Sequence, residues 1–184
     1  MAERSSLESA GTIKHRVFVS SFHDDAAYRR RWDDLFSSIL ISASVEPGEI
    51  DGSSSAEYVK RLIQEDYITQ ASVVVVLVGL KTHCRKHVDW EISAGLNKKV
   101  GGYSGLIGIW LPTHPNFGSG KCWTADPTPA RLADNLSSGY AKAFDWTEDA
   151  NKVKGWVEQA FEARLEHADK INNARPQLTK NLCD

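Results

Sequence analysis

The stretch Val73-Val-Val-Val-Leu-Val78 is the longest apolar run in the 184-residue chain. A strand with one face in water alternates apolar and polar residues, and this stretch does not alternate. We therefore predict a strand that is buried on both faces. Strands of this kind belong to parallel sheets that helices cover on both sides, so this run indicates an α/β fold.

Strand-like and helix-like segments alternate on both sides of this run, which indicates a parallel sheet with helices on both faces. The other predicted strands span 16–21, 41–45, 105–111 and 141–146, and the predicted helices span about 28–39, 54–67, 88–96, 131–138 and 153–165. Five strands in this order predict a flavodoxin-like sheet within one α/β domain. We expect that domain to cover residues 14–168, with flexible tails at 1–13 and 170–184.

Composition indicates which classes of partner are unexpected and which cellular compartment is favoured. The net charge is −2, so no basic excess favours nucleic acid as a partner. No apolar run approaches the roughly 20 residues that span a bilayer, so no membrane partner is expected. Residues 1–12 lack the apolar core of a signal peptide. Three cysteines without paired spacing, Cys84, Cys122 and Cys183, argue against a disulfide framework and favour a reducing, cytoplasmic setting.

Ligands of parallel sheets bind beyond the carboxyl ends of the strands, and three polar segments are expected there. They are residues 20–25, 46–55 and 79–91. The third is the richest in reactive side chains and reads Lys81-Thr-His-Cys-Arg-Lys-His-Val-Asp-Trp-Glu91. This segment is where the sequence places the candidate chemistry.

Glu91 lies beside the apolar stripe that Val88 and Ile92 mark on the third predicted helix. A carboxylate there can be half-buried and directed at a cleft, although spacing alone favours a solvated helix carboxylate. Asp89 is two residues away and points to a different face of the helix. The two acids are therefore not expected to act as a pair.

Other interpretations of these polar residues are weaker. His83, Cys84 and His87 lack the further ligand that a zinc site requires, and a Cys84 nucleophile rests only on a histidine adjacent in sequence. Asp24 and Asp25 are best explained as caps of the first helix, with a divalent-ion site as the alternative. From the residues alone, the chain is a soluble α/β domain with a polar cleft.

The same residues resemble TIR domains over about 14–165, specifically the TIR-like domain of the signalling enzyme of bacterial Thoeris antiphage defence. The resemblance is carried by Val17-Phe-Val-Ser-Ser21 followed by His23 and Asp24, by Val88-Asp-Trp-Glu-Ile92, by Gly108-Ile-Trp-Leu-Pro112, and by Glu46-Pro-Gly48 at the place of the interface loop. The loop at 112–129 is longer than in a minimal TIR domain, and the interface loop does not match receptor-type domains closely.

This resemblance implies a TIR-like fold and cleavage of the nicotinamide–ribose bond of NAD⁺. It implies a cyclic ADP-ribose isomer as the product, a second messenger that reaches a separate effector by diffusion. Glu91 would be the catalytic carboxylate. The substrate-binding residues would be Phe18, Ser20, Ser21, His23, Asp24, Lys81, Arg85 and Trp90. NAD⁺ would be the substrate, without a cofactor or metal, and the enzyme could be a homo-oligomer.

Three other functions are compatible with a fold of this type. A noncatalytic TIR adaptor would use the domain only for protein assembly. A nucleoside deoxyribosyltransferase would use a carboxylate to attack a ribosyl centre. A phosphoacceptor receiver domain needs an aspartate at the end of the third strand, and the sequence there is Val78-Gly-Leu80, which argues against it.

Overall fold

The computed structural model describes residues 14–44, 55–62, 67–120 and 122–183. Its sheet has five strands in the order β2-β1-β3-β4-β5, and every pairing is parallel. The strands are β1 (Arg16–Ser20), β2 (Ile41–Ala43), β3 (Val73–Val78), β4 (Gly105–Trp110) and β5 (Lys142–Asp145). This is the flavodoxin-like order, so the predicted sheet is confirmed.

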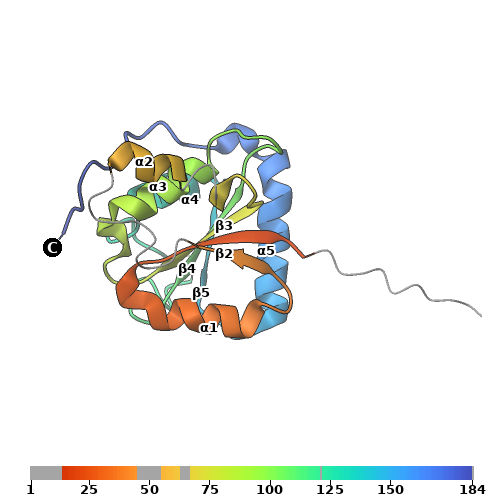
Figure 1. Cartoon of the computed structure of the whole chain (residues 1–184). Coiled ribbons are helices and arrows are strands. Elements are labelled where there is room, and N and C mark those ends of the chain that lie inside the picture. The colour runs from red at the N-terminus through yellow and green to blue at the C-terminus, as the bar shows by residue number, and fades with distance from the viewer. Residues whose placement is uncertain (1–13, 45–54, 63–66, 121, 184) are drawn as a thin grey trace, which may run out of the picture.

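Helices cover both faces of the sheet, as the alternation of segments predicts. They are α1 (Ala26–Phe36), α2 (Ala56–Leu62), α3 (Lys86–Gly95), α4 (Ala130–Ser138) and α5 (Ala150–Glu166). Short 3₁₀ turns are η1 (His23–Asp25), η3 (Thr82–Cys84) and η4 (Ala168–Lys170). Figure 1 shows α2, α3 and α4 together on one side of the sheet, with α1 and α5 on the other.

The central strand β3 is buried at every residue, which confirms the prediction made from its apolar run. Val74, Val76 and Val78 belong to the core cluster that includes residues of α3 and α4. Val73, Val75 and Leu77 belong to the second cluster, which includes residues of α1 and α5. Two hydrophobic cores therefore share one sheet, and this explains why β3 has no polar face.

Residues 171–183, here named the C-terminal segment, are packed against the domain, where the sequence led us to expect a flexible tail. Asn172 and Asn135 of α4 exchange two hydrogen bonds, and the Trp90 indole nitrogen of α3 donates to the Leu178 carbonyl at 2.7 Å. The segment is polar and is held by hydrogen bonds, so it shows no apolar periodicity. The predicted tail at 1–13 lies outside the described residues.

A disulfide joins Cys84 to Cys183 across a sequence separation of 99 residues. The odd cysteine count and the lack of paired spacing led us to expect no disulfide, and this expectation is wrong. Spacing cannot reveal a bond that depends on the C-terminal segment folding back onto α3. Cys122 is an exposed free thiol. Within the part of the chain that the structure describes, no helix is long and apolar enough to cross a membrane.

Candidate active site

Glu91 and Ser20 meet at the carboxyl end of β1. Val88 and Ile92 pack into the core cluster shared with β3, and this docks α3 against the sheet. Glu91, beside that apolar stripe, then faces the end of β1, where the Ser20 hydroxyl donates a hydrogen bond to Glu91 Oε2 at 2.5 Å. The structure therefore brings together two residues that the sequence assigned to one site.

The Glu91 side chain is more deeply buried than predicted, since only 7% of the residue is exposed. Burial raises the pKa of this carboxyl from 4.5 to about 8, and the Ser20 hydroxyl opposes that rise. Desolvation disfavours the charged form, and a single hydroxyl compensates for little of it. At neutral pH the carboxyl therefore retains its proton in this arrangement.

Asp89 faces α4 and not Glu91, as its spacing predicted. Its two oxygens accept hydrogen bonds from Arg131 Nε at 2.9 Å and Arg131 Nη2 at 3.3 Å. Asp89 Oδ2 also accepts from the Leu178 backbone nitrogen at 2.8 Å. This carboxylate is fully engaged in joining α3, α4 and the C-terminal segment, so its role is structural.

The loops after β1 and β3 meet at the surface, as expected for adjacent parallel strands. His23 Nε2 lies 3.0 Å from Asp24 Oδ1, and Lys81 Nζ lies 4.0 Å from Asp24 Oδ2. These side chains are about half exposed or more, and exposed ion pairs contribute less than about 1 kcal/mol to stability. Such weak pairs can exchange for contacts with a charged ligand.

Asp25 does not cap the first helix, which corrects the sequence interpretation. Its side chain makes no capping hydrogen bond. The carboxyl is buried against Gly79, where any Cβ would overlap it, and it accepts a hydrogen bond from Thr82 Oγ1 at 3.4 Å. Desolvation is the main cause that raises its pKa. Asp25 therefore joins the β1 and β3 loops, and the glycine directly after β3 was its only sequence signal.

The other residues predicted to bind substrate lie in different surroundings from Glu91 and Ser20. Phe18 and Trp90 are 0% and 2% exposed and belong to the core cluster, so neither side chain lines an open surface. Arg85 is partly buried and lies 3.9 Å above the Phe22 ring. Ser21 is partly exposed at the end of β1. Of the three polar segments expected at this edge, residues 46–54 lie outside the described part of the chain.

The described residues of the loop after β4 are held by a hydrogen-bond network, although the prolines of this loop predicted only an irregular excursion. Asn116 exchanges hydrogen bonds with the Thr124 backbone, at 2.9 Å in both directions. The Asn116 backbone nitrogen donates to His114 Nδ1 at 3.0 Å, and the His114 ring stacks on Trp110. Sequence reasoning missed this order because the network depends on loop geometry.

One group of potential metal ligands occurs among the described residues, formed by His83, Cys84 and Cys183. Metal ions bind cysteine as thiolate. Both sulfurs are joined in the disulfide and offer no thiolate in this state. His87 lies outside the group and faces the Trp90 ring edge-on.

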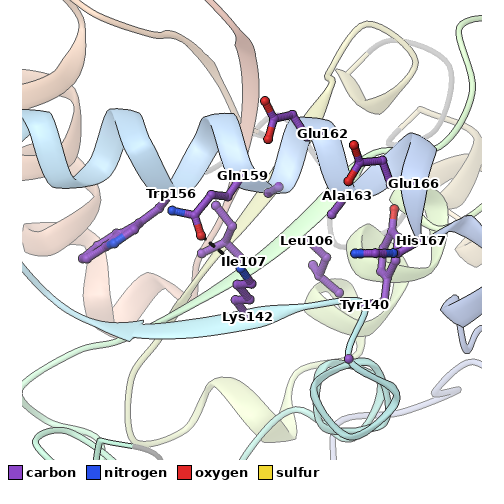
Figure 2. Close-up of a pocket in the computed structure, with 12 residues that line it drawn as sticks. Leu106, Ile107, Tyr140, Lys142, Trp156, Gln159, Glu162, Ala163, Glu166 and His167 are labelled. Carbon is purple, nitrogen blue, oxygen red and sulfur yellow. Dashed lines mark hydrogen bonds between the residues drawn. The ribbon is translucent and has the colours of Figure 1, made fainter.

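A separate cavity lies between α5 and the first residues of β4 and β5, at the opposite edge of the sheet (Figure 2). Lys142 and Gln159 form a 3.0 Å hydrogen bond in it, and Glu162, Glu166 and His167 lie along its helical wall. None of the residues predicted for NAD⁺ lines this cavity. The candidate active site is therefore at the carboxyl ends of β1 and β3, where Glu91, Ser20 and the side chains of the two following loops lie.

Comparisons with known proteins place the chain in a family. Several solved structures are similar to it, among them the following two. The TIR domains of the activated Roq1 resistosome, which recognises the pathogen effector XopQ, are 14% identical with a TM-score of 0.39, over 82% of this chain and 84% of that chain. The polysaccharide biosynthesis enzyme WcbI is 13% identical with a TM-score of 0.34, over 90% of this chain and 57% of that chain.

A search of curated protein sequences found no significant match. The family model of the TIR-like domain of the Thoeris protein ThsB matches residues 18–116, which is more than half of the chain. This range runs from β1 through β4 and includes both Ser20 and Glu91. The chain therefore belongs to the Thoeris ThsB family of TIR-like domains.

Proposed function

We propose that this protein cleaves the nicotinamide–ribose bond of NAD⁺, with Glu91 as the catalytic carboxylate and a cyclic ADP-ribose isomer as the product. The observation that carries the proposal is the buried hydrogen bond from Ser20 to Glu91 at the carboxyl end of β1. Ligands of doubly wound sheets bind at this edge. Membership of the Thoeris ThsB family supports a role in antiphage signalling.

The chemistry requires one carboxylate. Nicotinamide in NAD⁺ is already cationic, so it leaves as a neutral molecule without a general acid when the C1′–N bond breaks. The ribose then develops oxocarbenium-like charge, which a nearby carboxylate stabilises. Attack by water on C1′ gives ADP-ribose and a proton. Attack by a hydroxyl or an adenine nitrogen of the same molecule gives a cyclic product instead.

Glu91 must be ionised to stabilise that charge. Burial raises the pKa of Glu91 to about 8, but a cationic nicotinamide ring nearby would favour the carboxylate and lower that pKa. The Ser20 hydroxyl would then hold the ionised carboxylate in place. On this proposal the buried, protonated carboxyl is the resting form, and substrate binding converts it to the active form.

The exposed residues at the same edge would bind the rest of the substrate. Lys81 and Arg85 would face the pyrophosphate, and Lys81 would leave Asp24 to do so. Ser21, His23 and Asp24 would contact ribose or nicotinamide. A cytoplasmic location, where NAD⁺ is available, and assembly into homo-oligomers that complete the site belong to the same proposal.

Nicotinamide release from NAD⁺ by the purified protein tests the proposal, followed by chromatography and mass spectrometry. We expect Glu91→Gln to lower the rate by about 10²- to 10³-fold, the usual loss of one electrostatic group at a transition state. Glu57→Gln makes the same chemical change at an exposed position on α2 and should leave the rate unchanged. A second product lighter than ADP-ribose by one water identifies the cyclic isomer.

The deep burial of Glu91 favours one rival, a TIR domain that serves only for protein assembly. Cells that express the protein should therefore be assayed with and without phage, since a trigger could be required. If folded protein released neither nicotinamide from NAD⁺ nor free base from deoxynucleosides in any setting, the adaptor would be favoured. Release of free base from deoxynucleosides but not from NAD⁺ would instead identify a nucleoside deoxyribosyltransferase.

A further inference from the structure

The C-terminal segment supplies contacts that α3 cannot make for itself. The residue at the N-cap of α3 is Arg85, whose side chain makes no capping hydrogen bond. The Lys86 backbone nitrogen, in the first turn, instead donates to Asn181 Oδ1 at 3.1 Å. Free N–H groups at a helix start need an acceptor, and here a residue 95 positions away provides one.

Other hydrogen bonds extend this attachment along the first two turns of α3. The Leu182 backbone nitrogen donates to the Cys84 carbonyl at 2.9 Å, directly before the helix. The Leu178 backbone nitrogen donates to Asp89, and Trp90 donates to the Leu178 carbonyl. Residues 178–183 are therefore attached to the helix that carries Glu91.

The disulfide lies at the end of this attachment, next to the 2.9 Å hydrogen bond between the Leu182 nitrogen and the Cys84 carbonyl. Cys84 is 1% exposed, whereas Cys183 is partly exposed and residues 179–182 before it are exposed. Cys183 is therefore the more accessible residue of the pair, and we expect an incoming thiol to attack its sulfur rather than that of Cys84. Attack at Cys183 makes Cys84 the leaving group.

His83 is placed to assist that departure. Its Nε2 lies 3.1 Å from the Cys84 sulfur. An imidazole N–H next to a sulfur stabilises the thiolate, and a thiolate that is more stable leaves faster in thiol–disulfide exchange. The buried sulfur of the pair therefore has a neighbour that favours its release.

We propose that Cys84–Cys183 is a reversible thiol–disulfide exchange site that accepts a dithiol reductant and controls whether the C-terminal segment caps α3. One thiolate of the reductant attacks the Cys183 sulfur, the disulfide breaks, and Cys84 leaves as a thiolate that takes a proton. The second thiol of the reductant then attacks the mixed disulfide and releases Cys183 as a thiol. The reductant becomes a disulfide, and the protein gains two electrons and two protons.

Reduction would free residues 181–183 and remove the cap from the first turn of α3. Glu91 lies on this helix, so its position against Ser20 would become less defined. The oxidised protein would therefore be the better enzyme. This last step rests on the proposed NAD⁺ cleavage, whereas the exchange and the uncapping do not.

The test uses the full chain in dithiothreitol buffers of graded reducing strength, with alkylation and mass spectrometry to count free thiols. We expect Cys122 to be alkylated throughout, and Cys84 and Cys183 only after reduction of the folded protein. Hydrogen exchange at residues 86–90 should become about tenfold faster on reduction. The melting temperature should fall by on the order of 10 °C, because a long loop is no longer closed.

Two variants separate the effect of this bond from a general effect of reductant. Cys183→Ser should behave like the reduced protein under oxidising conditions, whereas Cys122→Ser should respond to dithiothreitol as the natural sequence does. If nicotinamide release is measurable, it should fall severalfold on reduction and in Cys183→Ser. If the protein does not cleave NAD⁺, the count of free thiols and the hydrogen-exchange rates still test the proposal.

Three results would overturn the proposal. The first is alkylation of Cys84 and Cys183 in the native protein before any reductant is added, including the case in which an intact mass shows both thiols holding a metal ion with His83. The second is a disulfide that dithiothreitol reduces only in denatured protein. The third is unchanged hydrogen exchange at residues 86–90 after reduction.

Discussion

The carboxyl groups on the two sides of α3 have opposite surroundings. Asp89 and Glu91 are each 7% exposed. On the side facing α4, Asp89 meets the Arg131 guanidinium and a backbone N–H. On the side facing β1, Glu91 meets one serine hydroxyl among the residues that the structure describes. A buried charge is stable only when it is paired, so the first acid is a structural anion and the second is an uncompensated acid.

This difference separates a carboxylate that supports the fold from one that is available for chemistry. A group already neutralised by a buried cation has little to offer a developing positive charge. A carboxyl held by a single hydroxyl can ionise when a cation arrives. Uncompensated burial, rather than burial alone, therefore distinguishes Glu91 as the candidate functional residue.

The largest expected effect comes from removing the partner of Asp89. Arg131→Met leaves a buried carboxylate without its cation, and we expect the free energy of unfolding to fall by about 3–5 kcal/mol. Urea denaturation measures this change. Adding Asp89→Asn removes the stranded charge and should restore part of the loss. Equal stability of Arg131→Met and the natural sequence would show that the two sides of α3 do not differ as described.

The second prediction concerns the pH dependence that Glu91 contributes. Its pKa is about 8 in the folded protein, whereas the ordinary value, which applies to the unfolded chain, is 4.5. Between pH 4.5 and about pH 8 the folded state therefore holds a proton that the unfolded state has lost. Stability from this group is therefore fully present below pH 4.5, falls as the pH rises, and is lost above pH 8.

The decline reaches at most about 1.4 kcal/mol per pH unit. Glu91→Gln cannot titrate and should lack this contribution, so the difference in unfolding free energy between the two proteins should change steadily from about pH 5 to about pH 8. Urea denaturation at several pH values gives the difference directly. A constant difference across that range would mean that Glu91 is ionised in the folded protein.

The smallest effect should come from Ser20→Ala, which removes the hydroxyl that hydrogen-bonds to Glu91. We expect a loss of about 1 kcal/mol in unfolding free energy, the usual value for one hydrogen bond. The Ser20 hydroxyl favours the ionised carboxyl, so the pKa of Glu91 should rise further in the variant. Nicotinamide release should fall by up to about tenfold, the rate equivalent of one hydrogen bond, which is less than in Glu91→Gln. Ser38→Ala, at an exposed position after α1 and outside the candidate site, is the matched control. Equal losses in the two serine variants would contradict a specific role for Ser20.

The sequence was most informative where apolar patterning determines structure. The unbroken run at Val73–Val78 predicted a doubly buried strand, and the alternation around it predicted all five parallel strands. Helical spacing of Val88 and Ile92 also placed Glu91 beside a buried stripe. These features follow from burial, which leaves a regular mark on the order of residues.

Features held by polar contacts between distant residues were missed or misinterpreted. The C-terminal segment has no apolar period, and its disulfide pairs residues 99 positions apart. Asp25 precedes a helix, as a capping residue would, and only its contact with Gly79 and Thr82 shows otherwise. How deeply Glu91 is buried also depends on the packing of α3 against the sheet, which the spacing of residues in the sequence does not reveal.

The attachment of residues 178–183 to α3 also has a consequence for synthesis on the ribosome. All five strands are complete at Asp145, so residues 178–183 are synthesised after the residues of the whole sheet. The first turn of α3 nevertheless obtains an acceptor from this region, since the Lys86 backbone nitrogen donates a hydrogen bond to Asn181 Oδ1. The helix that carries Glu91 would therefore reach its fixed position only after residues 178–183 had been synthesised and had folded back onto it.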